Sequence, residues 1–95
     1  MNTGTRITMR LQISGRVQGV GFRYYMQRKA QELGVAGWVR NRRDGSVEAM
    51  AHGSPESVSA IIAWAKRGPS GAAVSEVRIA EDDGEYAGFV ALPTE

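Results

Sequence analysis

The chain has 95 residues, a formal net charge of +2, 42% hydrophobic and 23% charged residues, and no cysteine. This length predicts one domain over residues 1–95, with a single core over about residues 7–92. The lack of cysteine excludes disulfides, thiolate catalysis and thiolate metal sites. No apolar run is long enough to cross a membrane, and Arg10 interrupts the first apolar stretch, which argues against a signal peptide. We therefore expect a soluble, cytoplasmic protein without a membrane partner. We also expect it to be a monomer.

The basic residues gather in the first half of the chain. Nine of the twelve lysines and arginines precede residue 44, whereas six of the ten acidic residues lie at or after Glu76. A field of this sign would concentrate a small anionic substrate near the basic half, and it would equally suit a nucleic-acid backbone.

The first third of the chain predicts a strand, a loop and an amphipathic helix. Apolar and polar residues alternate over residues 7–14, which is the period of a strand buried on one face. After a glycine-rich loop, apolar side chains recur at helical spacing, and Gly34 follows at the position of a helix C-cap. These helical positions are Phe22, Met26, Ala30 and Leu33.

The rest of the chain predicts a hairpin, a second helix and further strands. Residues 36–41 and 47–51 are typical of two short strands, and the Asp-Gly pair between them favours a hairpin. Ser54 before Pro55 marks a helix start, and Gly68-Pro69 marks its end. Residues 73–80 predict a strand in imperfect alternation, as a bulge would cause, and residues 89–92 a possible closing strand. This order predicts an α+β fold, the ferredoxin-like split βαβ sandwich (βαββαβ), in which two helices cover one face of an antiparallel sheet.

The loop over residues 15–23 is typical of an anion site. Its three glycines allow positive φ and a close approach of the backbone to a ligand, and the helix that follows begins with unpaired N–H groups. Arg23 stands in the first helical turn, where a cation opposes the helix macrodipole unless an anion is shared. Glycines alone would suit a tight connection, but Arg16 and Arg23 on either side favour the anion site. The spacing matches neither the nucleotide phosphate loop nor the dinucleotide fingerprint.

No nucleophile, general acid or metal site stands out elsewhere. We interpret His52, the single histidine, as an exposed or capping residue near a strand end, and Glu48 as a solvated strand residue. No metal and no cofactor is predicted. An acyl phosphate suits such a site, because its carboxylate leaving group, whose conjugate acid has a pKa of ~4, leaves without a general acid.

Two long motifs, over residues 15–23 and 37–48, closely resemble the signatures of the acylphosphatases, and the likeness runs over about residues 7–92. The resemblance implies a ferredoxin-like fold and metal-independent hydrolysis of acyl phosphates to a carboxylate and inorganic phosphate, which also inhibits. It implies that Arg23 grips the phosphoryl group, that Asn41 positions the attacking water, and that phosphate oxygens take the proton of that water. The phosphate-binding loop amides would come from Arg16, Val17, Gln18, Gly19, Val20, Gly21 and Phe22.

Two other classes of protein remain open. One is a binding or regulatory module of the kind that is fused to larger carbamoyl-transfer proteins. The length of 95 residues argues against this alternative. The other is an RNA-binding ferredoxin-like domain, but such domains carry exposed aromatics on their central strands, where this sequence has aliphatic residues. We therefore expect a small-molecule substrate and no nucleic-acid partner.

Overall fold

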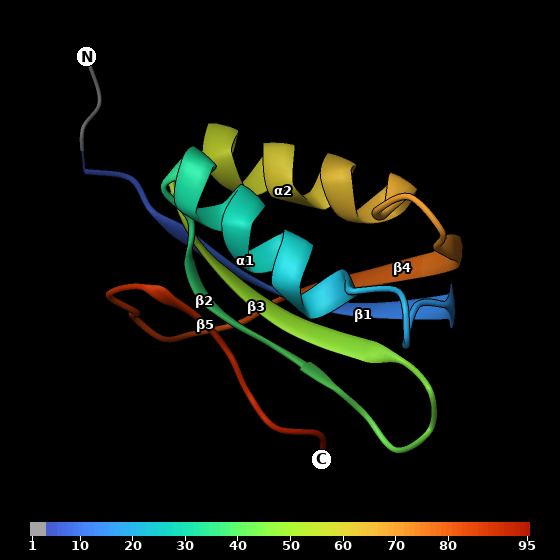
Figure 1. The fold of residues 1–95 in the computed structure, drawn as a ribbon. Helices are drawn as coiled ribbons and strands as arrows, with labels where there is room; N and C mark the ends of the chain where they lie inside the picture. The colour runs from blue at the N-terminus through green and yellow to red at the C-terminus, as the bar shows by residue number, and fades with distance from the viewer. Residues whose placement is uncertain (1–3) are drawn as a thin grey trace.

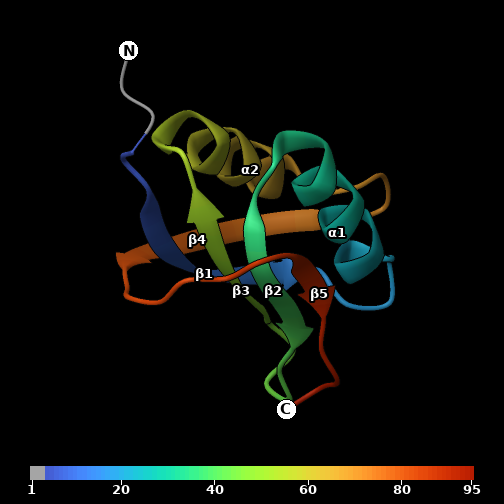
Figure 2. The same ribbon diagram turned by 90° about the vertical axis from the view of Figure 1, so that its left-hand side faces the viewer.

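The computed structural model describes residues 4–95, which form five strands and two helices (Figure 1). In chain order these elements are β1 (Ile7–Arg16), α1 (Phe22–Leu33), β2 (Ala36–Asn41), β3 (Val47–Gly53), α2 (Pro55–Arg67), β4 (Ala73–Glu81) and β5 (Phe89–Ala91). The predicted βαββαβ order is confirmed, with β5 as the closing strand. Both helices lie on one face of the sheet, as the turned view shows (Figure 2).

The strands form one sheet in the order β4-β1-β3-β2-β5. The first four strands pair antiparallel, as predicted, but β5 pairs parallel to β2, so the complete sheet is mixed. The reason is the connection over residues 82–88, which crosses one end of the sheet from the β4 edge to the β2 edge. The chain therefore enters β5 from the same end at which β2 begins.

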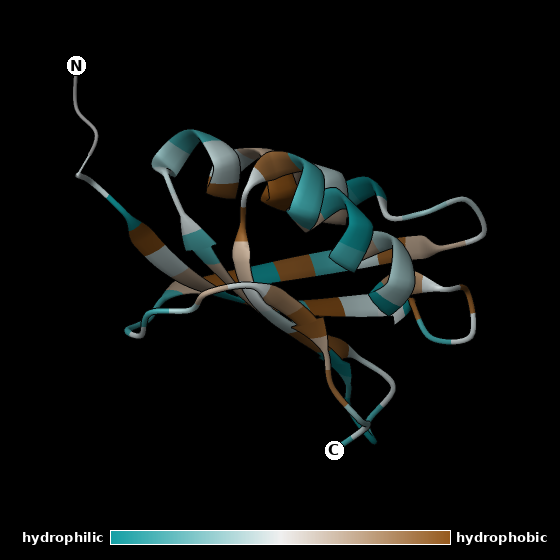
Figure 3. Cartoon of the chain, turned by 60° about the vertical axis from the view of Figure 1, so that its left-hand side comes forward, coloured by the Kyte–Doolittle hydropathy of each residue, from teal (hydrophilic) through white to brown (hydrophobic). Residues whose placement is uncertain are grey.

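The core lies between the sheet and the two helices. Both layers carry hydrophobic residues, which are coloured brown in Figure 3. Sheet residues such as Leu11, Ile13 and Val39 meet the predicted apolar stripe of α1 and that of α2. The buried helical side chains are Phe22, Met26 and Ala30 from α1 and Val58, Ile61 and Ala65 from α2. Burial of one face of each element thus explains the two periodicities seen in the sequence.

The helix ends follow the local signals of the sequence. Gly34 adopts a left-handed conformation with a φ of 74°, and its N–H bonds back to the carbonyl groups of Ala30 and Gln31. The side chain of Ser54 accepts a hydrogen bond from the Ser57 N–H at 3.1 Å, so the predicted N-cap of α2 is confirmed.

A bulge lies where β1 approaches its end. The pairing register of β1 and β4 shifts between Ser14 and Gly15, which explains the imperfect alternation of the β4 sequence. Gly15 has a φ of 120°, and a Cβ atom there would lie 2.2 Å from the carbonyl oxygen of Ala73. Only glycine therefore fits this point, and the bend directs the chain into the glycine-rich loop.

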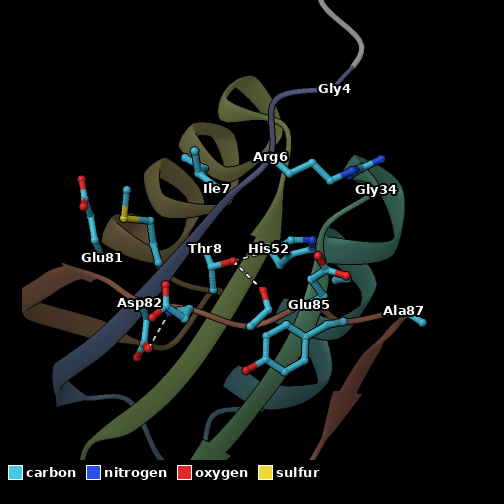
Figure 4. Close-up of a pocket in the computed structure, with 15 residues that line it drawn as sticks. Gly4, Arg6, Ile7, Thr8, Gly34, His52, Glu81, Asp82, Glu85 and Ala87 are labelled. Carbon is cyan, nitrogen blue, oxygen red and sulfur yellow. Dashed lines mark hydrogen bonds between the residues drawn. The ribbon is translucent and has the colours of Figure 1, made fainter.

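The interpretation of His52 as exposed or capping is wrong. Its side chain is only 9% exposed, near the end of β3 on the sheet face opposite the helices. Its Nδ1 atom lies 2.7 Å from the hydroxyl of Thr8, which donates to the Gly84 carbonyl at 3.0 Å (Figure 4). The crossing segment over residues 82–88 passes beside the histidine, and its Tyr86 ring lies edge-to-face with the imidazole at 6.1 Å between centroids. No local sequence pattern predicts that contact. A broad hollow lies beside it, at the sheet end opposite the glycine-rich loop.

Candidate active site

The connection between β1 and α1 forms a row of free amide donors. Among residues 4–95, the backbone N–H groups of residues 17–21 make no hydrogen bond to another protein group, and the first turn of α1 adds its own unpaired N–H groups. Gly19 and Gly21 have φ values of 76° and 79°, which let the chain curl around this point. We call residues 16–22 the anion cradle.

The cradle is attached to the core through Val17 and is open to solvent at Gly19. Val17 is 1% exposed and belongs to the core cluster, so it anchors the loop to the protein. A Cβ atom placed on Gly19 would meet no other atom within 4 Å, which leaves this side of the loop open to a ligand. The cradle therefore combines a rigid base with an accessible row of donors.

The side chain of Gln18 ties the cradle to the β2–β3 hairpin. Its Nε2 atom donates to the carbonyl oxygens of Arg42 at 2.7 Å and Ser46 at 2.9 Å. Only a backbone role in the loop was predicted for Gln18, and its side-chain partners lie more than twenty residues away in the sequence. The two hydrogen bonds give the loop a defined position relative to the end of β2.

Arg23 lies in the first turn of α1, directly after the cradle. Its guanidinium donates one hydrogen bond, from Nη1 to the carbonyl oxygen of Leu92 at 2.9 Å. An arginine has five N–H donors, so four remain for a ligand. Since Leu92 is a neutral partner, the positive charge of Arg23 is not neutralised by this contact.

Asn41 is the last residue of β2. Strand β2 ends at the same end of the sheet as β1, which leads into the cradle (Figure 1). It pairs with Val47, which in turn pairs with Ile13 shortly before β1 reaches the cradle. Strand alternation puts its side chain on the face of the buried Val39, which is the face that the helices cover. The chain thus carries Asn41, Arg23 and the cradle at one end of the molecule, from three different elements.

The interpretation of Glu48 as a solvated residue is wrong, because three arginines enclose it. Glu48 is 7% exposed, and its carboxylate accepts from Arg40 Nε at 2.9 Å and Arg42 Nη1 at 3.1 Å, and from Arg10. Arg40 and Arg42 flank Asn41, so this cluster holds both neighbours of that residue. The arginines meet Glu48 only through strand pairing, which sequence spacing does not reveal.

The charges of this cluster set the protonation state of Glu48. Burial would raise the pKa of the Glu48 carboxyl, but the hydrogen bond and charge of Arg40 and the charges of Arg10 and Arg42 outweigh it. Its pKa therefore lies below the ordinary value, and the carboxylate stays ionised at neutral pH. Glu48 is thus a fixed anion on the outer face of the sheet and has no proton to offer a reaction.

Two further arginines leave this end of the molecule positive. Arg16 and Arg43 are exposed, and neither takes part in an ion pair among the residues that the structure describes. Asp44 is the nearby acid in sequence, and the hydroxyl and N–H groups of Ser46 lower its pKa. Free arginines beside unpaired amides favour the approach of an anion.

The described chain holds no group of three or more His, Asp or Glu side chains placed to bind a metal ion. Within residues 4–95, no helix is both long and apolar enough to cross a membrane. The fold and the site thus define a small α+β domain with a loop of free backbone amides, an arginine at the end of this loop and an asparagine on a neighbouring strand.

Comparison with known proteins identifies the family. The Acylphosphatase family profile matches residues 9–91. An acylphosphatase from Thiobacillus denitrificans is 60% identical over 82 residues, which cover 86% of this chain and 92% of that protein. The structure of an acylphosphatase from Coxiella burnetii superposes with a TM-score of 0.91 at 36% identity, over 97% of this chain and 100% of that one. The chain therefore belongs to the acylphosphatase family, and it is an enzyme of acyl phosphate hydrolysis.

A similar domain also occurs inside a much longer protein. The structure of full-length HypF in the phosphate- and nucleotide-bound form matches 95% of this chain with a TM-score of 0.87 at 28% identity, but the match covers only 12% of the HypF chain.

Proposed function

We propose that the protein hydrolyses acyl phosphates without a metal ion, with the anion cradle and Arg23 holding the phosphoryl group and Asn41 positioning the attacking water. The observation that carries this proposal is the row of unbonded amides over residues 17–21, followed directly by an arginine with four free donors. Several N–H groups and a planar guanidinium suit a tetrahedral oxyanion. Because the cradle is anchored by Val17, it needs little reorganisation as charge develops.

The proposed reaction is an in-line displacement at phosphorus. Water attacks the phosphorus atom, the bond from phosphorus to the acyl oxygen breaks, and the carboxylate leaves with the bonding electron pair. The proton of the water passes to a phosphoryl oxygen, so the products are a carboxylate and inorganic phosphate. This reaction needs no protein base, which agrees with the arginines, backbone amides and asparagine found at this end of the molecule. Catalysis then consists of positioning and charge stabilisation, as in other phosphoryl transfers.

The test separates binding from chemistry. Arg23→Lys keeps the charge but loses the planar fork, so both phosphate affinity and turnover of benzoyl phosphate should fall. Asn41→Ala should lower kcat steeply and leave phosphate affinity close to that of the parent, because a residue that holds the attacking water contributes mainly in the transition state. Phosphate affinity is measured calorimetrically on variants shown to be folded, and all assays contain a chelator.

The outcomes are distinct. Turnover that a chelator abolishes and a divalent ion restores would contradict the metal-free mechanism. Near-normal kcat for Asn41→Ala would contradict the role of that residue while leaving the reaction class intact.

A binding module without turnover is the alternative, and the comparisons disfavour it, because the match covers 92% of the acylphosphatase from Thiobacillus denitrificans but only 12% of the HypF chain. Such a module would bind phosphate through the same cradle. It would release no phosphate from benzoyl or acetyl phosphate under conditions in which it binds inorganic phosphate.

A further inference from the structure

Residues 92–95 continue past β5 along the edge of β2. The Leu92 N–H donates to the Val39 carbonyl at 2.8 Å, and the Glu95 N–H donates to the Asn41 carbonyl at 3.0 Å. The Glu95 carbonyl in turn accepts from the Arg43 N–H at 3.2 Å, and the Glu95 carboxylate pairs with Arg40. This segment is therefore bonded to the chain on both sides of Asn41.

The same segment also holds Arg23. The Leu92 carbonyl oxygen is the one protein acceptor of the Arg23 guanidinium among the described residues. A long arginine side chain has considerable rotamer freedom, and a fixed acceptor at its tip restricts that freedom. Gln27 on the next turn of α1 makes a comparable contact, from its Nε2 atom to the Phe89 carbonyl at 3.2 Å. Helix α1 thus rests on β5 and on residues 92–95.

We infer that residues 92–95 are a positioning segment, which fixes the Arg23 guanidinium and the Asn41 backbone relative to each other. The inference rests on the proposed function of these two residues. Arg23 belongs to a helix and Asn41 to a strand, and this segment hydrogen-bonds to both. Phosphoryl transfer demands that the water and the phosphoryl group be aligned, and small misplacements lower the rate strongly. The segment acts through its backbone and touches neither the water nor the phosphoryl group.

The contact between the positioning segment and Asn41 is tested by removing one backbone N–H group. Glu95→Pro deletes the N–H that donates to the Asn41 carbonyl, and Glu95→Ala, which loses only the carboxylate, is its reference. Thr94→Pro is the matched proline control, because the Thr94 N–H makes no hydrogen bond among the described residues. We expect Glu95→Pro to lower kcat on benzoyl phosphate about tenfold relative to Glu95→Ala, with phosphate affinity within about twofold. Thr94→Pro, which deletes no hydrogen bond of the described chain, should lose less kcat than Glu95→Pro does.

The half that concerns Arg23 is tested at Leu92. Leu92→Pro deletes the N–H that attaches the segment to Val39 and so displaces the Leu92 carbonyl, whereas Leu92→Ala keeps both groups. We expect Leu92→Pro to weaken phosphate binding as well as turnover relative to Leu92→Ala, because Arg23 serves binding. We thus expect Glu95→Pro to lose turnover but not phosphate binding, and Leu92→Pro to lose both. General destabilisation would not produce this difference between the two variants.

The results that overturn the inference differ from those that overturn the proposed function. If Asn41→Ala loses kcat but Glu95→Pro turns over like Glu95→Ala, the positioning segment is refuted and the role of Asn41 stands. Equal losses in Glu95→Pro and Thr94→Pro would also refute it, as an effect of proline alone. If Asn41→Ala itself keeps its kcat, the proposed function of that residue fails first.

Discussion

Gln18→Glu is the substitution that best tests how the cradle is held. The change is isosteric, but it replaces the amide group that donates to the carbonyl oxygens of Arg42 and Ser46, at 2.7 and 2.9 Å, by a carboxylate oxygen. Two hydrogen bonds worth about 1 kcal/mol each are lost, and oxygen then faces oxygen, so we expect about 2–3 kcal/mol of destabilisation. In a domain of this size, each kcal/mol lowers the melting temperature by about 4–8 °C. A negative charge beside the cradle should also weaken phosphate binding.

Gln31→Glu is the matched control, since Gln31 is exposed on α1 and its side chain makes no hydrogen bond in the described chain. It brings the same change of charge without the two lost bonds. Thermal unfolding and phosphate titration of both variants at pH 7 and at lower pH measure the difference. Two carbonyl neighbours should raise the pKa of the carboxyl introduced at position 18, so the deficit in stability should shrink as pH falls and the group becomes protonated. If the free energies of unfolding of the two variants differ by less than about 0.5 kcal/mol at pH 7, the two hydrogen bonds of Gln18 do not contribute to stability.

Three further outcomes follow from the geometry. Inorganic phosphate should inhibit competitively and raise the melting temperature, since it binds only the folded cradle, and Gly19→Val should weaken both effects; wild-type phosphate affinity in that variant would contradict the backbone argument. Gly15→Ala should prevent or severely weaken folding, because its Cβ would lie 2.2 Å from the Ala73 carbonyl oxygen, and a circular dichroism melt like that of the parent would contradict this. Glu48→Gln should lower the free energy of unfolding by about 1–3 kcal/mol at neutral pH. Because the pKa of Glu48 is lowered in the folded protein, the full loss of stability should be seen above the ordinary pKa of 4.5, and it should shrink as the pH falls below that value. A loss of stability that does not change with pH in chemical unfolding would contradict this.

The elements of the fold could be predicted because their signals are local. The β1 alternation, the apolar stripe of α1 and the Ser54-Pro55 start of α2 each reflect one buried face or one capped end, and such features repeat within a few residues. The loop between β1 and α1 could also be located from the sequence, because its three glycines lie between Arg16 and Arg23; its binding of an anion stays a prediction. The anion-binding role of Arg23 was inferred from its place in the first helical turn and from the family resemblance, and the role of Asn41 from the resemblance alone. Both roles stay predictions, as do the monomeric state and the cytoplasmic location.

The sequence by itself thus determined the element order, the two layers and the position of the glycine-rich loop that we propose as the anion site. Only the tertiary structure decided the parallel pairing of β5, the burial of His52 and the enclosure of Glu48 by arginines. It also decided that Gln18 reaches the hairpin and that residues 92–95 contact both Arg23 and Asn41. The physical reason is distance along the chain, because each of these contacts depends on strand register or on a crossing segment. The residues next to a polar side chain in the sequence do not indicate which distant group will become its partner.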